Sequence, residues 1–205
     1  DLGLTDFIVL SDGTKVANPK FLSNLEKKLA RQQNILAKRR EVAKKEARNL
    51  SDSRNYQKQK IKVAKIYEKI TNARKDFLHK LSFTIIKNHD VIAIEDLNVK
   101  GMVKSRSLAK AISDSSWSSF ISMLTYKAEW YRKMLVRIDR WYPSSKTCSN
   151  CNHLLSKAEL PLSLRQWQCP SCKQDNDRDI NASINILNAG LIMATIKTVG
   201  ATGLA

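Results

Sequence analysis

Apolar residues recur at helical spacing through the long polar segment 21–80. The first part of this segment carries a leucine series with one polar gap, at Gln32: Leu22, Leu25, Leu29 and Leu36. After a polar break at residues 49–53, the spacing resumes with Ile66, Ile70, Ala73, Phe77 and Leu81. Narrow apolar seams of this period predict two long helices in an antiparallel hairpin, the second of which runs to about Lys87.

Short stretches of β-forming residues lie on either side of the hairpin. Residues 1–18 combine such residues with the turn signal Ser11-Asp12-Gly13 and therefore predict a two-stranded ribbon. The run Val91-Ile92-Ala93-Ile94 is short and continuously apolar, which is typical of a buried central strand. A further strand is predicted from Leu135, Val136, Ile138 and Trp141.

Two more helices are predicted in the second half of the chain. Residues 107–133 carry apolar side chains at helical spacing, namely Trp117, Phe120, Ile121, Leu124 and Ala128. Another helix is expected from Asp179 to about Asn188, and the apolar tail that follows, to Ala205, predicts no defined element. The whole pattern indicates an α/β protein whose 205 residues can form one core and an appendage.

The charge balance indicates a polyanionic partner. Lys and Arg number 36 against 19 Asp and Glu, a formal net charge of +17, and residues 21–80 hold 18 of these cations but only 6 of the acids. Nucleic acid is the favoured partner, because every neutralised phosphate releases counterions. An anionic membrane surface ranks second, and a merely solvated helix face or a protein-binding surface are further alternatives.

No apolar run approaches the roughly 18 residues of a membrane span, and the sequence has no signal-peptide pattern. We therefore expect no membrane association and a cytoplasmic location. The chain opens at Asp1 rather than at Met, so we expect it to be processed or to be a piece of a longer protein.

The four cysteines form two Cys-x-x-Cys pairs. Cys148 and Cys151 make the first pair, and Cys169 and Cys172 make the second after 17 intervening residues. This spacing fits a closed tetrahedral Zn²⁺ site, which would hold structure and perform no chemistry. A disulfide framework is the alternative, but dense disulfides belong to small secreted chains. The pattern therefore favours structural zinc in a reducing compartment.

Three acids combine with predicted strand or helix ends. Asp1 opens the first strand, Glu95 closes the buried strand, and Asp179 lies where a helix begins. If they converge, Mg²⁺ or Mn²⁺ would relieve their mutual repulsion. Each also has an ordinary interpretation, as a chain terminus, a strand-end charge or a helix cap. Neighbouring acids compete for the same roles: Asp96 with Glu95, and Asp175 and Asp177 with Asp179.

Several segments together resemble the TnpB/OrfB family of bacterial and archaeal insertion sequences, proteins often described as probable transposases and similar to compact type V CRISPR effector nucleases. The resemblance rests on Asp1-Leu2-Gly3-Leu4, Ile94-Glu95-Asp96-Leu97-Asn98-Val99, Ser116-Trp117 with Phe120, residues 142–151, Cys169-Pro170-Ser171-Cys172 and residues 177–185. It runs along essentially the whole chain and is more specific than any single motif.

The resemblance implies an RNase H-like (RuvC) nuclease domain with a mixed sheet, an inserted basic helical hairpin and a zinc ribbon. It implies that Asp1, Glu95 and Asp179 hold two Mg²⁺ or Mn²⁺ ions for RNA-guided cleavage of DNA, and that the four cysteines bind zinc. DNA and a guide RNA are then the expected partners. The domains would be 1–145 with 176–205 for the nuclease, including the hairpin at about 20–88, and 146–175 for the ribbon. A bacterial or archaeal cytoplasm, near the nucleoid, is the expected location.

The chain departs from the family pattern in two places. Asn152 and Lys173 stand where glycine usually relaxes the knuckles, so mild strain is expected, more at Lys than at Asn. Full-length relatives carry an N-terminal half that binds guide RNA and the motif beside the target, and this sequence does not include it. A non-catalytic nucleic-acid-binding remnant is therefore the alternative function. The three tryptophans Trp117, Trp130 and Trp141 are expected in the core, with base stacking as their alternative role.

Overall fold

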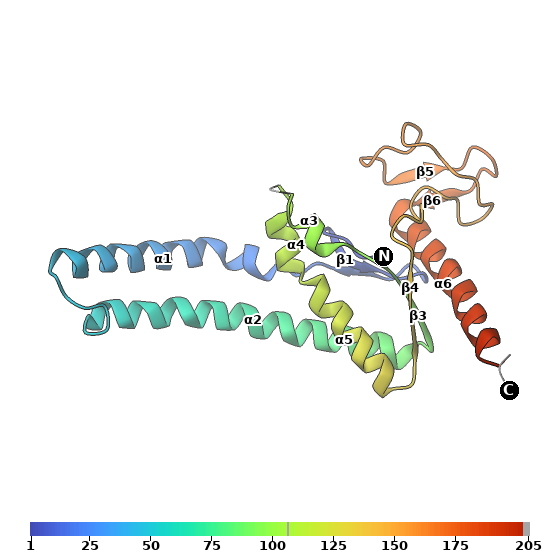
Figure 1. Cartoon of the computed structure of the whole chain (residues 1–205). Coiled ribbons are helices and arrows are strands. Elements are labelled where there is room, and N and C mark those ends of the chain that lie inside the picture. Colours follow the sequence, from blue (N-terminus) through green and yellow to red (C-terminus); the bar gives the residue numbers. More distant parts are fainter. Residues whose placement is uncertain (106, 203–205) are drawn as a thin grey trace. The chain divides into compact units, whose positions relative to one another are not determined.

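The chain forms two compact units in the computed structural model, which describes residues 1–105 and 107–202 (Figure 1). The first unit comprises Asp1–Pro19 with Leu81–Ala205, and the second comprises Lys20–Lys80. The second unit is the helical hairpin, and the first carries all the strands and the remaining helices.

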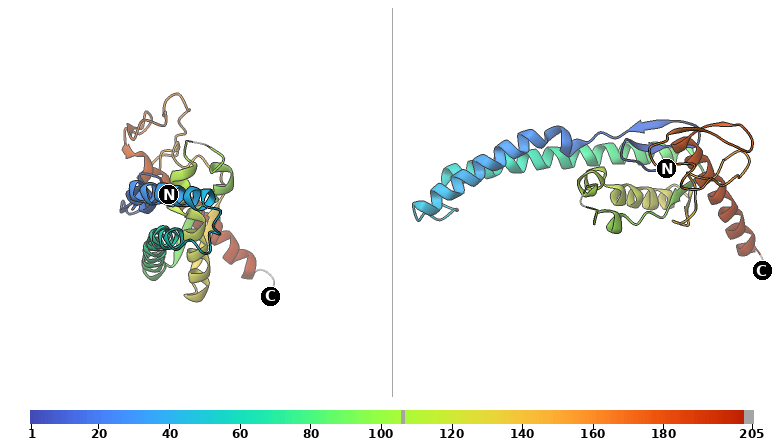
Figure 2. Two further views of the ribbon diagram at one scale, coloured as in Figure 1. Left: turned by 90° about the vertical axis from the view of Figure 1, so that its left-hand side faces the viewer. Right: turned by 90° about the horizontal axis from the view of Figure 1, so that it is seen from above.

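The hairpin has the two long helices that its period predicted. Helix α1 spans Phe21–Lys45 and helix α2 spans Arg54–Asn88. Figures 1 and 2 both show α1 lying along the first part of α2. Leucine and isoleucine side chains from both helices form the buried seam, which contains Leu29, Val63, Ile66 and Ile70.

Two side-chain amides, one buried and one half-buried, fill the polar gap in the seam. The Gln59 side chain is almost fully buried, and its Nε2 donates to the backbone oxygen of Gln32 at 2.9 Å and to Gln32 Oε1 at 2.8 Å. Because a buried amide without a partner costs about 1–3 kcal/mol, this pair favours one register of the two helices. Gln32, the polar residue that interrupts the leucine series, is thus explained by its hydrogen bonds with Gln59.

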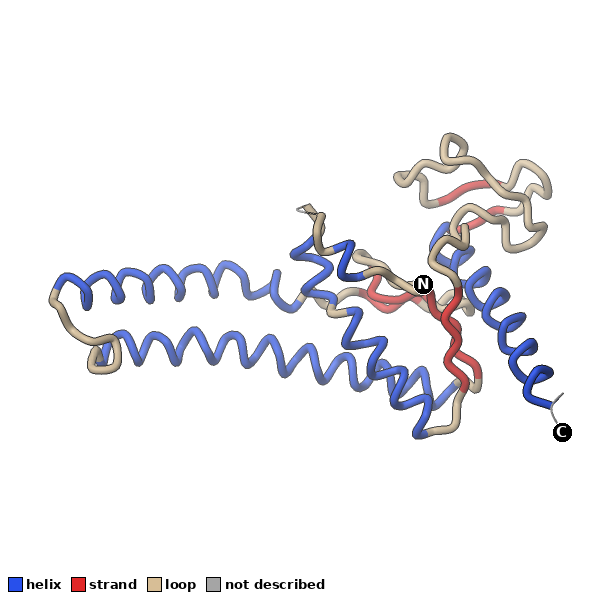
Figure 3. The backbone as a smooth tube through the Cα atoms, in the orientation of Figure 1, coloured by secondary structure: helices blue, strands red, loops and turns tan. Residues whose placement is uncertain are grey.

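Within the described residues, the strands form three separate two-stranded sheets. Strands β1 (Asp6–Val9) and β2 (Lys15–Ala17) are antiparallel, as predicted. Strands β3 (Val91–Glu95) and β4 (Met134–Ile138) are parallel and in register from Val91↔Met134 to Glu95↔Ile138. Strands β5 (Gln166–Gln168) and β6 (Asp175–Asp177) form an antiparallel pair in the cysteine-containing segment, which is otherwise mostly loop (Figure 3).

The sequence predicted a single mixed sheet, but the described strands are not joined by one continuous hydrogen-bonded ladder. A cavity of about 140 Å³ is lined by Ile8 and Val9 of β1 and by Ile92 and Ile94 of β3. Residues 1–3 pair with β1 instead: Leu2 forms an antiparallel bridge with Ile8, and Val9 N donates to Asp1 O at 2.9 Å. Strands β1 and β3 therefore line one cavity and share no ladder.

The helical segment between β3 and β4 is divided, where one helix over 107–133 was predicted. Helices α3 (Val99–Met102), α4 (Ala109–Ser115) and α5 (Trp117–Trp130) occupy it. Ser116 separates α4 from α5 with a left-handed backbone, φ 55°. The prediction of one helix was wrong because the spacing of apolar residues gives no sign of a single residue with a left-handed backbone. Helix α5 still buries Phe120, whose ring contacts that of Phe7 edge-on at 5.1 Å.

Helix α6 (Arg178–Thr202) extends well beyond its predicted end near Asn188 and packs on β3 and β4. Gly190, which reads as a helix breaker, instead permits close packing: a Cβ at this position would lie 2.4 Å from Ala93 Cβ. Ala182 and Ile186 are buried on the same helix. Contact with the β3–β4 pair therefore stabilises a helix that local propensity underestimates.

Only one of the three tryptophans expected in the core is there. Trp117 is 2% exposed, whereas Trp130 is 74% and Trp141 is 84% exposed. Strand β4 ends at Ile138, before Trp141, so the predicted strand was too long. No helix of the described chain has the length and hydropathy needed to cross a bilayer.

Candidate functional site

The four cysteine sulfurs converge in the segment between β4 and α6. Their Sγ atoms all lie within 4.8 Å of one another, with Cys148 and Cys172 3.7 Å apart and Cys151 and Cys169 3.6 Å apart. A tetrahedral zinc with Zn–S bonds of about 2.3 Å requires S···S separations of about 3.8 Å. The donor set and its spacing therefore fit a Cys₄ metal site, and the geometry matches the prediction for Cys148, Cys151, Cys169 and Cys172.

Both knuckles use the same backbone turn. Asn152 N donates to Cys148 O at 2.8 Å, and Lys173 N donates to Cys169 O at 2.9 Å. Asn152 and Lys173 are left-handed, with φ 61° and φ 63°. Asn152 and Lys173, where the lack of glycine predicted mild strain, thus have the left-handed backbone that favours glycine.

Hydrogen bonds to sulfur favour the thiolate form at one ligand. The Asn150 side-chain amide donates to Cys172 Sγ at 3.5 Å. This bond, together with the backbone N–H of Gln174, lowers the pKa of Cys172 to about 6. Thiolate is the form that binds a metal, so the Asn150 side chain, together with the Gln174 N–H, prepares this cysteine for ligation.

Two asparagines of α6 fasten the start of the cysteine segment. Asn181 and Asn185 lie four residues apart on one helix face, and their Nδ2 atoms donate to Thr147 O at 2.7 and 2.6 Å. Asn185 Nδ2 also donates to Ser144 O at 2.8 Å, and Asn181 Oδ1 accepts from Ser149 N at 2.8 Å. Both asparagines are buried. These bonds fix the loop that leads into Cys148.

The same loop holds Glu95. Ser144 Oγ donates to Glu95 Oε1 at 2.5 Å, and Glu95 is half-buried at the end of β3. Asp96, its predicted competitor, forms an ion pair with Arg140 instead. Within the described residues, the other carboxylate oxygen of Glu95 has no hydrogen-bond partner. Glu95 lines the cavity beside Asp1.

Asp1 lies at the same cavity. Its α-ammonium donates to Val9 O at 3.0 Å, and the paired backbone bond from Val9 N fixes the residue against β1. Burial lowers the pKa of this α-ammonium to about 6, while the negative charges of Glu95 and Asp179 act in the opposite direction. Asp1 and Glu95 therefore share one cavity, and Asp179 lies in the first turn of the helix that packs on β3.

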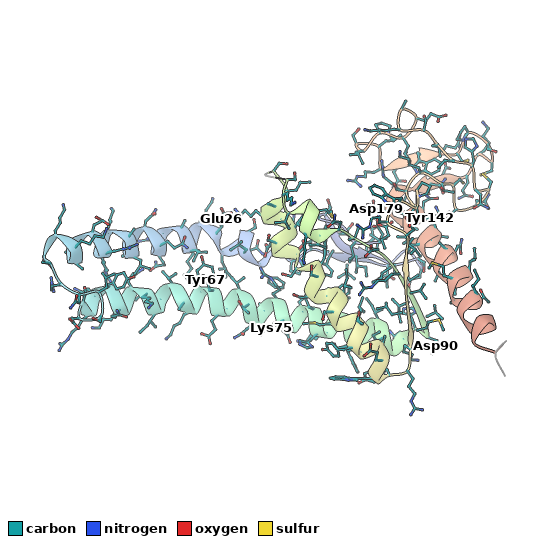
Figure 4. All side chains as sticks on the ribbon, in the orientation of Figure 1. Glu26, Tyr67, Lys75, Asp90, Tyr142 and Asp179 are labelled. Carbon is teal, nitrogen blue, oxygen red and sulfur yellow. The ribbon has the colours of Figure 1, made fainter. Side chains whose placement is uncertain are left out.

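Asp179 lies in the first turn of α6, and Figure 4 shows it and Asp90 at opposite ends of the β3–β4 pair. Its Oδ1 accepts from Arg165 Nη1 at 3.2 Å. Its rival Asp177 has a different role: Asp177 Oδ1 accepts the backbone N–H groups of Asp179 and Ile180, and Oδ2 accepts Lys15 Nζ at 2.7 Å. Asp177 is thus the helix cap, a role that the sequence had left open for Asp179.

The three acids do not form a tight cluster. Across the described ranges, the cysteines are the one group of three or more metal-ligand side chains whose ligand atoms all lie within 4.8 Å. Carboxylates that share two ions about 3.5–4 Å apart are spread more widely than the ligands of one ion. The hard oxygen donors of Asp1, Glu95 and Asp179 suit Mg²⁺ or Mn²⁺ in kind.

Sequence reasoning missed four residues that position this region: Ser144, Arg165, Asn181 and Asn185. The spacing of the two asparagines, at i and i+4 beside Asp179, is a signal that could have placed them on one helix face. Ser144 and Arg165 come from loops, and no periodic pattern marks them.

Two family models cover most of the chain. Residues 1–106 match OrfB_IS605, described as "Probable transposase", and residues 117–186 match "Cas12f1-like, TNB domain". A "Putative RNA-guided DNA endonuclease" of Streptomyces pristinaespiralis is 44% identical over 191 residues, 93% of this chain and 44% of the relative. "Putative RNA-guided DNA endonuclease InsQ" of Escherichia coli (strain K12) is 32% identical over 205 residues, 93% of this chain and 48% of the relative.

A solved structure has the same fold over most of the chain. The "Cryo-EM structure of the Cas12f1-sgRNA-target DNA complex" superposes with a TM-score of 0.54 at 16% sequence identity, covering 85% of this chain and 43% of that one. This likeness concerns the fold alone. The chain spans a little under half the length of the two relatives named above.

Proposed function

The chain belongs to the OrfB_IS605 family of probable transposases, and we propose that it is the nuclease portion of an RNA-guided DNA endonuclease. The resemblance inferred from its motifs is thereby confirmed. The observation that carries the proposal is that Asp1 and Glu95 line one cavity, while Asp179 lies in the first turn of the helix that packs on the strand of Glu95. The names of the relatives supply the substrate class.

In this proposal Asp1, Glu95 and Asp179 hold two Mg²⁺ or Mn²⁺ ions within an RNase H-like (RuvC) domain. Bound there, such ions supply an activated water and stabilise the leaving 3′ oxygen of a DNA phosphodiester, which leaves a 5′ phosphate. Ser144 orients Glu95 by its hydrogen bond. Arg165, 3.2 Å from Asp179, is placed to contact a phosphate that approaches this carboxylate.

The cysteine segment, residues 146–175, is proposed as a structural zinc ribbon. A closed Cys₄ shell has no open position for substrate, so this metal would stabilise the fold and take no part in cleavage. The nuclease domain would then comprise residues 1–145 with 176–205. Basic residues of the hairpin would hold DNA or a guide RNA by the phosphate backbone, in a prokaryotic cytoplasm near the nucleoid.

A cleavage assay with matched variants tests the nuclease proposal. Labelled single-stranded and duplex DNA are incubated with the chain at increasing Mg²⁺ or Mn²⁺. Glu95→Gln removes the charge that the ions require, so cleavage should fall by at least about 100-fold. Asp96→Asn, one residue away and paired with Arg140, is the control and should keep most of the activity.

Equal cutting by the wild type and Glu95→Gln would refute this assignment of the acids. If neither chain cuts but both bind DNA, the non-catalytic remnant is the better description of the 205 residues alone.

A further inference from the structure

A groove runs along helix α5 and strand β4. It consists of two open pockets of about 520 and 630 Å³ that share Thr125, Glu129 and Arg137 and are therefore continuous. We name it the α5–β4 groove and define it by the polar side chains along its length: Lys100, Thr125, Arg132, Lys133, Arg137 and Arg140. Nothing in the acid site or the cysteine ribbon uses these residues, apart from the Asp96 partner of Arg140.

The groove is strongly cationic. Five of its lining residues are Lys or Arg, against one carboxylate, Glu129. Two of the five are already paired, Lys133 with Asp90 and Arg140 with Asp96. Arg137 is exposed, and within the described residues its guanidinium has only a long contact, 3.4 Å to Thr125 Oγ1. Such a series of cations along a strand is suited to a polyanion that follows the strand direction.

Aromatic side chains accompany the cations. Tyr126 lines the groove and stacks edge-on with Trp130, ring centroids 4.7 Å apart. Trp141 follows the lining residue Arg140 directly in sequence. Trp130 and Trp141 are the most exposed tryptophans of the chain, although both were expected in the core. Large rings held open to solvent beside cations are what stacking of unpaired bases requires.

The groove also leads to the acid site. Leu97 lines both the groove and the cavity that contains Asp1 and Glu95. Leu97 comes two residues after Glu95, at the end of β3 where β4 also ends. A polynucleotide strand that lies along β4 therefore reaches the neighbourhood of Glu95.

We propose that the α5–β4 groove binds a single-stranded polynucleotide, with Arg137 and Arg140 on phosphates and Trp141 stacked on a base. The inference deepens the proposed nuclease function and rests on it, because it supplies the path by which the cleaved strand enters. A duplex is disfavoured, since its bases are already stacked and cannot reach an aromatic side chain. DNA and RNA single strands share this chemistry, and the relative affinities for oligo(dT) and oligo(U) show which of them the groove prefers.

Binding is measured by fluorescence anisotropy of labelled oligo(dT), oligo(U) and a duplex of the same length, about 12 nucleotides, without added divalent cations. Trp141→Ala should weaken single-strand binding about tenfold and leave duplex binding unchanged. Arg137→Gln should lower the slope of log affinity against log salt by about 0.7, the contribution of one phosphate contact on a single strand. The matched control is Lys157→Gln, an exposed cation of the cysteine segment, which should leave the slope unchanged.

The outcomes separate this proposal from the nuclease proposal. Affinity is measured without metal, so a chain that binds single strands through the groove but never cuts supports the groove alone. If Trp141→Ala and Arg137→Gln bind both oligonucleotides as tightly as Lys157→Gln does, the groove is not a strand-binding site, whatever the cleavage result. An equal effect of Trp141→Ala on duplex and single strand would also overturn the proposal, because stacking would then not be the cause.

Discussion

Substitution of Lys173 measures the conformational free energy that a non-glycine residue costs in the second cysteine knuckle. Its φ of 63° lies in the left-handed region, which a residue with a Cβ adopts at a cost of about 1–2 kcal/mol. The side chain is exposed and the residue N–H donates to Cys169 O at 2.9 Å. Lys173→Gly should therefore retain the hydrogen bond while it removes the steric cost.

The expected gain is smaller than the steric cost. Glycine makes the unfolded chain more flexible, which offsets about 0.5–1 kcal/mol. The net stabilisation of the ribbon is then about 0.5–1 kcal/mol. Because zinc binding is coupled to the folding of such ribbons, this gain should appear as a roughly twofold to fivefold increase in zinc affinity.

The assay is competition for Zn²⁺ between the full chain and a chromophoric chelator at constant pH. Lys173→Ala is the first control, since it removes the charge but keeps the Cβ, and it should not show the gain. Asn152→Gly is the second, at the equivalent position of the first knuckle, where φ is 61°. Asparagine tolerates this conformation, so its gain should be smaller. Equal affinities for Lys173→Gly and Lys173→Ala would refute the backbone argument.

Three further changes test other parts of the fold. Gly190→Ala places a Cβ 2.4 Å from Ala93 Cβ and should cost about 1–3 kcal/mol in thermal unfolding, largely recovered by a second change, Ala93→Gly. Burial opposes ionisation of Asp177, but hydrogen bonds from its lysine partner and from helix N–H groups hold its pKa below 3.8. The stability advantage of the wild type over Asp177→Asn in urea titrations should thus be full above pH 3.8 and vanish as the pH falls through the lower folded pKa. Ser144→Ala removes the bond to Glu95 and should slow cleavage about tenfold while zinc content stays constant.

Local sequence patterns predicted the elements in which apolar residues recur at the regular spacing of a helix or a strand. The hairpin seam, the β1–β2 ribbon and strand β3 each have a repeat that the sequence displays, and the cysteine spacing alone defined both knuckles. The assignment of Asp1, Glu95 and Asp179 came from the family resemblance, because spacing alone does not single them out, and it stays a prediction. These features depend on neighbours within a few residues or on a motif.

Other features depend on contacts between distant segments, and the pattern did not predict them. Helix α6 continues through Gly190 because Ala93 packs closely against it. Trp130 and Trp141 looked like core residues because aromatic character does not distinguish a buried ring from a ring held open to solvent. Arg165 meets Asp179 only after the β5–β6 turn has folded back on α6. Side-chain chemistry alone cannot assign these partners, since many residues of each kind compete for them.

The contacts of α6 connect the cysteine cluster physically to the acid site. Cys148 directly follows Thr147, whose backbone oxygen accepts both asparagine amides of α6, and the same loop presents Ser144 to Glu95. This loop is held at one end by the cysteine cluster and along its length by the asparagines of α6. If the four sulfurs separate, the first of these two constraints is lost, and Ser144 is held less firmly beside Glu95. The ribbon therefore has a role in the arrangement of the acids although it offers no ligand to them. Loss of a metal ion from the four cysteines should consequently impair Glu95, a carboxylate on a different strand that such an ion would not contact.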